Sequence, residues 1–291
     1  MLNIFKLGYV EFGVKDKQAM SSYYSDIMGF SLTEEGSDGR VYLSSAIDHH
    51  NIILTPSEES GVRSIGLQYT SDLSVQEVSE YLKFEFDITN EIKTEPGVDE
   101  LIEFTDPEGY VIHLYPKMEL VNPGFKTQGI IPNKIGHISL NVKDAKKQVA
   151  FYSKLGFVNT DWIEDFFAFM TCNRDHHVLN FCESGKHELH HLAFEMRNYN
   201  HLVEKIDFLR LNDIHLEWGP SRHGAGHNIA CYHPDADGNR IELFTDADIF
   251  IKELGIFEPR PWHKDFPQKP KVWPTDECLS LWGVDFENAL V

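Results

Sequence analysis

The sequence lacks several features that would assign it to particular classes of protein. Its 26 Lys and Arg against 46 Asp and Glu give a net charge of −20 at pH 7. Nucleic acids and anionic membranes attract clustered positive charge, so neither is expected as a partner. No apolar run approaches the roughly 20 residues that span a bilayer. The start of the chain has no basic segment followed by a long apolar core, so no signal peptide is predicted.

Cysteine is scarce, and its spacing suggests neither disulfide nor zinc chemistry. The four residues form no CxxC pair and lie far apart, at Cys172, Cys182, Cys231 and Cys278. We expect free buried thiols in a reducing compartment and predict a cytoplasmic protein. The 291 residues suffice to bury a full core and to form two domains.

The chain contains an internal repeat. A predicted strand over 3–14 leads into a helix that Asp16 caps, and one over 136–142 leads into a helix that Asp144 caps. Three further correspondences keep nearly the same offset: Tyr9 with His137 at 128 residues, Gly66 with His191 at 125, and His113 with Glu242 at 129. This near-constancy predicts a βαβββ unit that occurs twice in each half.

A connector rich in proline and glycine divides the halves. Its turn-forming residues are Pro123, Gly124, Gly129 and Pro132. We place a linker at 123–133, between predicted domains at 1–122 and 134–248. The tail at 249–291 lies outside the repeat and is too apolar to be disordered by composition, so we predict a lid or a subunit interface.

Three predicted strands each carry a metal-binding type of residue on the face opposite their apolar side chains. In the strand over 136–142, alternation places His137 on the face opposite Ile138. The same alternation singles out His191 and Glu242 in two later strands. Two imidazoles and one carboxylate form the ligand set of non-haem Fe(II) oxygenases, in which coordination positions stay open.

The first half provides an internal comparison for this ligand set. Its corresponding positions hold Tyr9, Gly66 and His113, which cannot supply two imidazoles and a carboxylate. Because the predicted fold occurs both with and without the three ligands, the fold itself does not require them. We therefore interpret them as a metal site rather than as structural polar residues.

The sequence resembles the type I extradiol, or meta-cleaving, catechol dioxygenases of the vicinal oxygen chelate superfamily, over nearly all of residues 1–250. The matching motif consists of GPSRH at 219–223, Tyr232, and DADG at 235–238 ahead of Glu242. In the family this last turn usually reads DPxG. Ala236 departs from that pattern, while the spacing to the glutamate is kept.

This resemblance implies an α+β fold of four βαβββ modules that form two domains, each an incomplete barrel of mixed β-sheet with helices outside. The first domain would have lost its metal. His137, His191 and Glu242 of the second would hold Fe(II), with Mn(II) as the other candidate. The implied protein is a homo-oligomeric enzyme of aromatic compound degradation that inserts both atoms of O2 into a catechol-type substrate.

The resemblance also implies roles for other side chains. His177 corresponds to the acid–base histidine, and Tyr232 and His223 to residues that hydrogen-bond the substrate oxygens. The residues predicted to contact the substrate are Phe169, Trp218 and Arg222. Trp218 and the tryptophans of the tail predict an apolar substituent on the catechol. We expect the other histidines to be surface, turn or supporting residues, among them His176, His190, His227 and His263.

Two other functions fit parts of the pattern. A glyoxalase-like isomerase of the same superfamily would also bind a metal, but such enzymes commonly use an additional carboxylate and share ligands between modules or subunits. A binding protein that sequesters a small aromatic molecule would tend to lack the complete ligand set. The presence of His177 and Tyr232, beside a first half without ligands, favours the dioxygenase.

Overall fold

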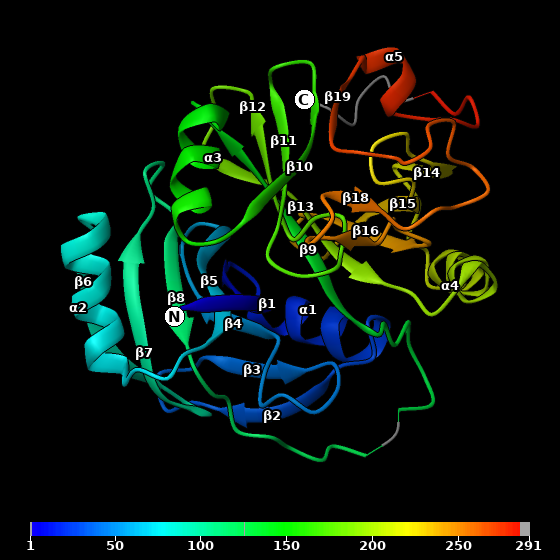
Figure 1. The fold of residues 1–291 in the computed structure, drawn as a ribbon. Helices are drawn as coiled ribbons and strands as arrows, with labels where there is room; N and C mark the ends of the chain where they lie inside the picture. Colours follow the sequence, from blue (N-terminus) through cyan, green and yellow to red (C-terminus); the bar gives the residue numbers. More distant parts are fainter. Residues whose placement is uncertain (1, 125, 286–291) are drawn as a thin grey trace. The chain divides into compact units, whose positions relative to one another are not determined.

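The computed structural model describes residues 2–124 and 126–285 (Figure 1). Its contacts divide the chain into two compact units. Of the described residues, the first unit comprises 2–124, 126–135, 154–156 and 235–238, and the second comprises 136–153, 157–234 and 239–285. Among the described helices, none is long and apolar enough to cross a bilayer.

The first unit consists of two βαβββ modules. The first module contains β1 Asn3–Val14, α1 Lys17–Ser22 with a π-helical turn η1 Tyr23–Ile27, β2 Ser31–Glu35, β3 Val41–Ser44 and β4 Ile52–Pro56. The second contains β5 Gly61–Thr70, α2 Val75–Phe86, β6 Asn90–Glu95, β7 Val98–Thr105 and β8 Val111–Tyr115. These strands form one sheet in the order β2-β3-β4-β1-β5-β8-β7-β6, so the predicted repeat is confirmed in this half.

The register of this sheet brings the three non-ligand positions side by side. Tyr9 in β1 pairs with Gly66 in the antiparallel strand β5, and Gly66 pairs with His113 in the parallel strand β8. The correspondences found in the sequence therefore meet on three neighbouring strands in the middle of the sheet.

The second unit repeats this plan. Its first module contains β9 Lys134–Val142, α3 Ala145–Lys154, β10 Val158–Ile163, β11 Phe167–Thr171 and β12 Leu179–Glu183. Its second contains β13 Glu188–Glu195, α4 Tyr199–Leu211, β14 Trp218–Arg222, β15 Ile229–Pro234 and β16 Arg240–Thr245. The strand order is β14-β15-β16-β13-β9-β12-β11-β10-β19, where β19 comes from the tail. The predicted fold class of four βαβββ modules is confirmed.

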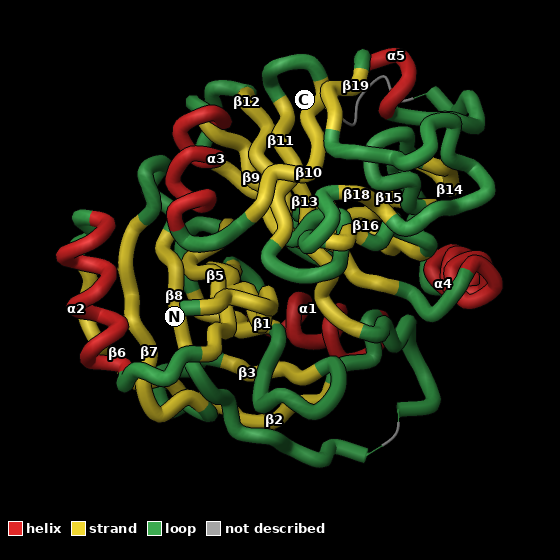
Figure 2. The backbone as a smooth tube through the Cα atoms, in the orientation of Figure 1, coloured by secondary structure: helices red, strands yellow, loops and turns green. Residues whose placement is uncertain are grey.

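Local sequence signals account for where these elements begin. Asp16 Oδ1 accepts the Ala19 N–H at 2.9 Å, and Asp144 Oδ1 accepts the Lys147 N–H at 2.8 Å, so both predicted helix caps are confirmed. In the second unit, α3 and α4 lie outside the curled strands (Figure 2). The four cysteines are free and buried, as predicted.

The described part of the tail packs onto the second unit. It contains β17 Phe250–Ile251, β18 Ile256–Phe257, β19 Lys271–Trp273 and α5 Thr275–Cys278. Strand β19 pairs in parallel with β10. The Gly224 N–H donates to the Cys278 carbonyl and the Leu281 N–H to the Arg222 carbonyl, each at 2.7 Å. The tail therefore runs alongside the end of the GPSRH segment. Residues 286–291 of the predicted tail lie outside the described residues.

Candidate functional site

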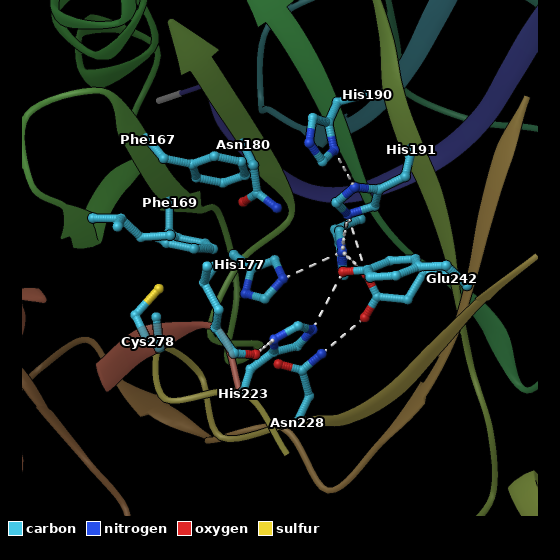
Figure 3. Close-up of a pocket in the computed structure, with 15 residues that line it drawn as sticks. Phe167, Phe169, His177, Asn180, His190, His191, His223, Asn228, Glu242 and Cys278 are labelled. Carbon is cyan, nitrogen blue, oxygen red and sulfur yellow. Dashed lines mark hydrogen bonds and ion pairs between the residues drawn. The ribbon is translucent and has the colours of Figure 1, made fainter. Parts of the chain in front are cut away.

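The three candidate ligands converge because β16, β13 and β9 are neighbours in the sheet. His137 Nε2 lies 3.1 Å from His191 Nε2 and 3.3 Å from Glu242 Oε2. His191 Nε2 lies 3.1 Å from the same carboxylate oxygen (Figure 3). All three side chains are buried. The structure thus brings together residues that the sequence separates by 105 positions.

These separations fit a shared metal ion. The three donor atoms all lie within 4.8 Å of one another, so a single ion could contact all of them. Burial by itself would raise the pKa of Glu242, but His137 and His191 outweigh burial and hold that pKa well below its usual range. Burial lowers the pKa of His191 to about 4 despite the opposing effect of Glu242. At neutral pH Glu242 and His191 are therefore unprotonated, as metal binding requires.

Two further side chains hold the ligands in place. Asn228 donates from Nδ2 to Glu242 Oε1 at 2.8 Å, which leaves Oε2 to face the histidines. His190 and His191 face each other through Nδ1 atoms 2.6 Å apart. When His191 coordinates through Nε2, its Nδ1 carries the proton and donates to His190, which fixes the orientation of the ring.

A cavity opens beside the ligands and has two chemically different ends (Figure 3). The polar end is formed by the three ligands with His177, Asn180, His190, His223, Asn228 and Tyr232. The apolar end is formed by Ile163, Phe167, Phe169, Ala225, Cys278 and Leu279. No Lys or Arg is among the described residues that line the cavity. The last two apolar residues belong to the tail, which therefore forms part of the wall.

His177 lies at the edge of the ligand group. Its Nε2 is 3.4 Å from His137 Nε2, and the two ring centroids are 4.1 Å apart. Burial, together with the neighbouring imidazole of His137, lowers the pKa of His177 well below its usual value. A neutral imidazole at a cavity wall can take up a proton from a bound molecule and return it.

His223 and Tyr232 form a hydrogen-bonded pair on the cavity wall. His223 Nδ1 donates to the Leu279 carbonyl at 2.7 Å, because a carbonyl can only accept. The neutral ring then accepts the Tyr232 O–H through Nε2 at 3.2 Å. Burial raises the pKa of Tyr232 well above its usual value and lowers the pKa of His223. Both groups are therefore uncharged at neutral pH and suited to hydrogen-bond a diol.

The structure places the three predicted substrate-contact residues differently. Phe169 lines the cavity. Trp218 stacks on His223, with ring centroids 5.0 Å apart and planes inclined by 12°, and lies outside the lining. Arg222 Nη1 donates to the His227 carbonyl at 2.6 Å, and its guanidinium lies 4.2 Å from the ring centroid of Trp262. Trp218 and Arg222 thus support the wall from behind, and the geometry gives them no direct contact with a bound molecule.

The sequence does not predict several residues of the cavity. They are Asn180, His190, Asn228, Cys278 and Leu279. His190 stands next to a predicted ligand, and Asn228 lies five positions after His223, so proximity to a motif was the one available signal. A single sequence does not indicate which polar neighbour turns toward a ligand, or which tail residue reaches the cavity.

A second buried group of metal-binding residue types joins the tail to the loop before β15. His227 Nδ1 and His263 Nε2 lie 2.7 and 2.8 Å from the two carboxylate oxygens of Asp248. These are hydrogen-bond lengths, so each imidazole donates a hydrogen bond to the carboxylate. We interpret the group as a fastening of the tail rather than as a metal site.

In the first unit, the positions that correspond to the ligands are filled. Tyr9 Oη lies 2.6 Å from His113 Nδ1, and His113 Nε2 lies 2.9 Å from Glu103. A Cβ atom at Gly66 would overlap the ring of Tyr9. The tyrosine therefore occupies the space that a ligand side chain would need.

Comparisons with known proteins agree with this architecture. A sequence model of the Glyoxalase/Bleomycin resistance protein/Dioxygenase superfamily matches residues 134–243. The manganese-dependent 2,3-dihydroxybiphenyl 1,2-dioxygenase of Geobacillus genomosp. 3 is 25% identical over an alignment that covers 93% of each chain.

Two solved structures share the fold of both halves. The 2,3-dioxygenase LapB from Pseudomonas sp. KL28 gives a TM-score of 0.82 at 21% identity, covering 94% of this chain and 98% of that one. The Mn(II)-bound glyoxalase from Novosphingobium aromaticivorans gives 0.83 at 23% identity, covering 97% and 92%. The chain thus resembles the Glyoxalase/Bleomycin resistance protein/Dioxygenase superfamily in the sequence of residues 134–243, and it shares its fold with both solved structures.

Proposed function

We propose that the protein is a metal-dependent extradiol dioxygenase that inserts both atoms of O2 into a catechol-type substrate. One observation carries the proposal: the group of His137, His191 and Glu242 opens into the same cavity as His177, His223 and Tyr232. A ligand set suited to a redox-active metal ion and groups able to exchange protons therefore face one space. The dihydroxybiphenyl dioxygenase and LapB, both dioxygenases by name, support the same activity.

We propose Fe(II) as the resident metal. His137, His191 and Glu242 would hold the ferrous ion, which would supply the redox chemistry of ring cleavage by O2. Mn(II) suits the same donors, and manganese is named for the dihydroxybiphenyl dioxygenase and the glyoxalase. Reconstitution of the metal-free protein with each ion separately, followed by turnover measurements, tests the choice of iron. Turnover by the Mn(II)-loaded protein together with no turnover by the Fe(II)-loaded protein would contradict it.

In this proposal, three side chains form hydrogen bonds with the substrate hydroxyl groups or exchange protons with them. A catechol O–H can replace the Tyr232 O–H as the donor to the unprotonated Nε2 of His223, and the Tyr232 O–H can then donate to a substrate oxygen. His177 approaches the ligand group through Nε2 and can return a proton as the ring opens. These roles need only neutral side chains, which burial favours at all three positions.

The cavity wall favours an apolar substrate. The end remote from the ligands consists of apolar side chains, and the described lining contains no Lys or Arg. A carboxylate substituent would be desolvated there without a cationic partner, which is strongly unfavourable. We therefore propose catechols that are unsubstituted or carry a neutral apolar group.

The test is O2 uptake by the ferrous-reconstituted protein with unsubstituted, alkyl-, aryl- and carboxyl-substituted catechols. We expect one O2 consumed per catechol, a yellow semialdehyde product, and a higher kcat/KM for the apolar members. The absence of O2 uptake with every catechol would contradict the activity. Preference for the carboxylated members would contradict the substrate class alone.

A glyoxalase-like isomerase is the second candidate, because the Mn(II)-bound glyoxalase shares the fold over nearly the whole chain. Isomerisation consumes no O2. Anaerobic conversion of a glutathione hemithioacetal, together with no uptake of O2 on addition of catechols, would favour this activity. Tight binding of catechols with neither reaction would instead indicate a non-catalytic aromatic-binding protein.

A further inference from the structure

His177 is the first member of a row of three buried polar side chains that leads away from the cavity. Its Nδ1 lies 2.8 Å from Nδ1 of His176. His176 Nε2 lies 2.9 Å from Oδ2 of Asp161. The residues are 6%, 0% and 2% exposed in that order, so solvent has little access to these hydrogen bonds.

The chemistry of the three groups determines where their protons lie. A carboxylate only accepts hydrogen bonds, so His176 donates from Nε2 to Asp161. In the neutral ring, Nδ1 of His176 then carries no proton and accepts from Nδ1 of His177. His177 is left with an unprotonated Nε2, which is the atom that approaches His137 beside the cavity.

The tail holds Asp161 in place. Trp273 donates from Nε1 to Oδ2 at 2.8 Å, and the Lys271 backbone N–H donates to Oδ1 at 2.8 Å. Together with His176, three donors act on one carboxylate, which cannot rotate without breaking at least one hydrogen bond. The pairing of β19 with β10 brings both tail donors to Asp161.

The first unit contains the same three groups at a constant offset of 127 residues, as Glu34, His49 and His50. There the two Nδ1 atoms are 3.0 Å apart, and His49 Nε2 lies 3.3 Å from Glu34. The Glu34 side chain is 44% exposed, whereas that of Asp161 is 1% exposed. The hydrogen bonds of the row are thus shorter, and its carboxylate is less exposed, in the unit that carries the metal-binding group.

We propose that Asp161 and His176 are positioning residues that hold His177 with Nδ1 protonated and with an unprotonated Nε2 directed at the cavity. The inference rests on the proposed function, in which His177 exchanges a proton with the substrate. In the opposite tautomer Nε2 would already carry a proton and could not accept one. Asp161 and His176 act through His177 and do not line the cavity.

Histidine ring ¹⁵N spectra of the full-length protein measure the tautomers without any turnover. At neutral pH we expect Nδ1–H for His177 and Nε2–H for His176. His176→Phe should leave His177 as a mixture of tautomers. His176→Gln should restore Nδ1–H at His177, because the amide oxygen can accept from His177 while the amide nitrogen donates to Asp161.

The kcat values of the metal-loaded proteins should change in parallel with the tautomer of His177. We expect His176→Phe to lower kcat roughly 100-fold with KM changed less than about threefold, at unchanged metal content, and His176→Gln to regain most of kcat. His49→Phe removes the equivalent imidazole from the first unit and should leave kcat unchanged.

Wild-type tautomers or wild-type kcat in His176→Phe would overturn the inference, and so would a His176→Gln protein as slow as His176→Phe. If the wild-type protein consumed no O2 with any catechol, the proposed function would fail instead. The tautomers would still show whether Asp161 and His176 position His177.

Discussion

At the level of single residues, the ligand group combines one carboxylate and two imidazoles at a buried position. Burial of Glu242 would favour its neutral form, yet two imidazoles keep its pKa low. Each partner therefore relies on the others, and removal of one member leaves the rest poorly compensated.

Glu242→Ala is expected to abolish stable metal binding, because two imidazoles remain and the carboxylate that compensates the cation is lost. Metal content after reconstitution and desalting measures the effect. His113→Ala changes the corresponding position of the first unit and should retain one metal per chain. Full metal content in Glu242→Ala would show that the ion lies elsewhere.

His177→Phe is expected to keep the metal and to lose most turnover, by roughly 100-fold or more in kcat, because it removes an acid–base group without removing a ligand. Parallel metal analysis and steady-state O2 uptake separate the two effects. Unchanged kcat would remove His177 from the proposed chemistry.

The buried histidines predict how stability depends on pH. Burial lowers the pKa of His50 from 6.5 to about 3. Between these values the unfolded chain binds a proton that the folded chain does not. The contribution of His50 to stability is therefore constant above pH 6.5 and falls on acidification, by about 1.4 kcal/mol per pH unit.

His50→Phe should consequently flatten the pH dependence of the first unit's unfolding free energy by about one proton. Urea unfolding at pH 7 and pH 5 measures this difference, and an equal slope in the two proteins would contradict it. His215→Phe, a substitution at an exposed position of the second unit, serves as the control and should leave that slope unchanged.

At the scale of elements, the tail is an integral part of the second unit. Its strand β19 extends the sheet, its donors hold Asp161, and its Leu279 carbonyl fixes the tautomer of His223. The tail thus acts on both sides of the cavity through backbone and side-chain hydrogen bonds.

Two tryptophans of the tail offer a matched test of this packing. Trp273 is 6% exposed, whereas Trp282 is 48% exposed. Trp273→Ala should destabilise the second unit by about 3 kcal/mol or more, while Trp282→Ala should cost about 0.5 kcal/mol. Urea unfolding measures both. Equal losses would contradict the packing of β19 against β10.

At the scale of the whole molecule, one architecture occurs twice with different contents. The first unit fills its central positions with the ring of Tyr9, and the second leaves a cavity beside three ligands. Metal binding should therefore stabilise one unit and not the other.

The distribution of tryptophan allows this asymmetry to be measured. All five tryptophans, Trp162, Trp218, Trp262, Trp273 and Trp282, belong to the second unit. Metal at 100 times its Kd should stabilise that unit by about 2.7 kcal/mol and raise the melting temperature seen by tryptophan fluorescence. Glu242→Ala should show no such rise. A metal-induced rise in that variant would contradict the assignment.

The amino-acid sequence is enough to predict the βαβββ repeat, the helix caps at Asp16 and Asp144, and the strand faces that carry His137, His191 and Glu242. These features follow from periods of two and from offsets between copies, which are local or repeated properties of the chain.

Three features become visible only in the folded chain. Asn228 and His190 hold the ligands, Arg222 turns away from the cavity, and Asp161 meets Trp273 across 112 positions. Such contacts depend on how the tail folds back and on which rotamer each side chain adopts. No short-range pattern encodes either, because the partners are brought together by packing of the completed sheet.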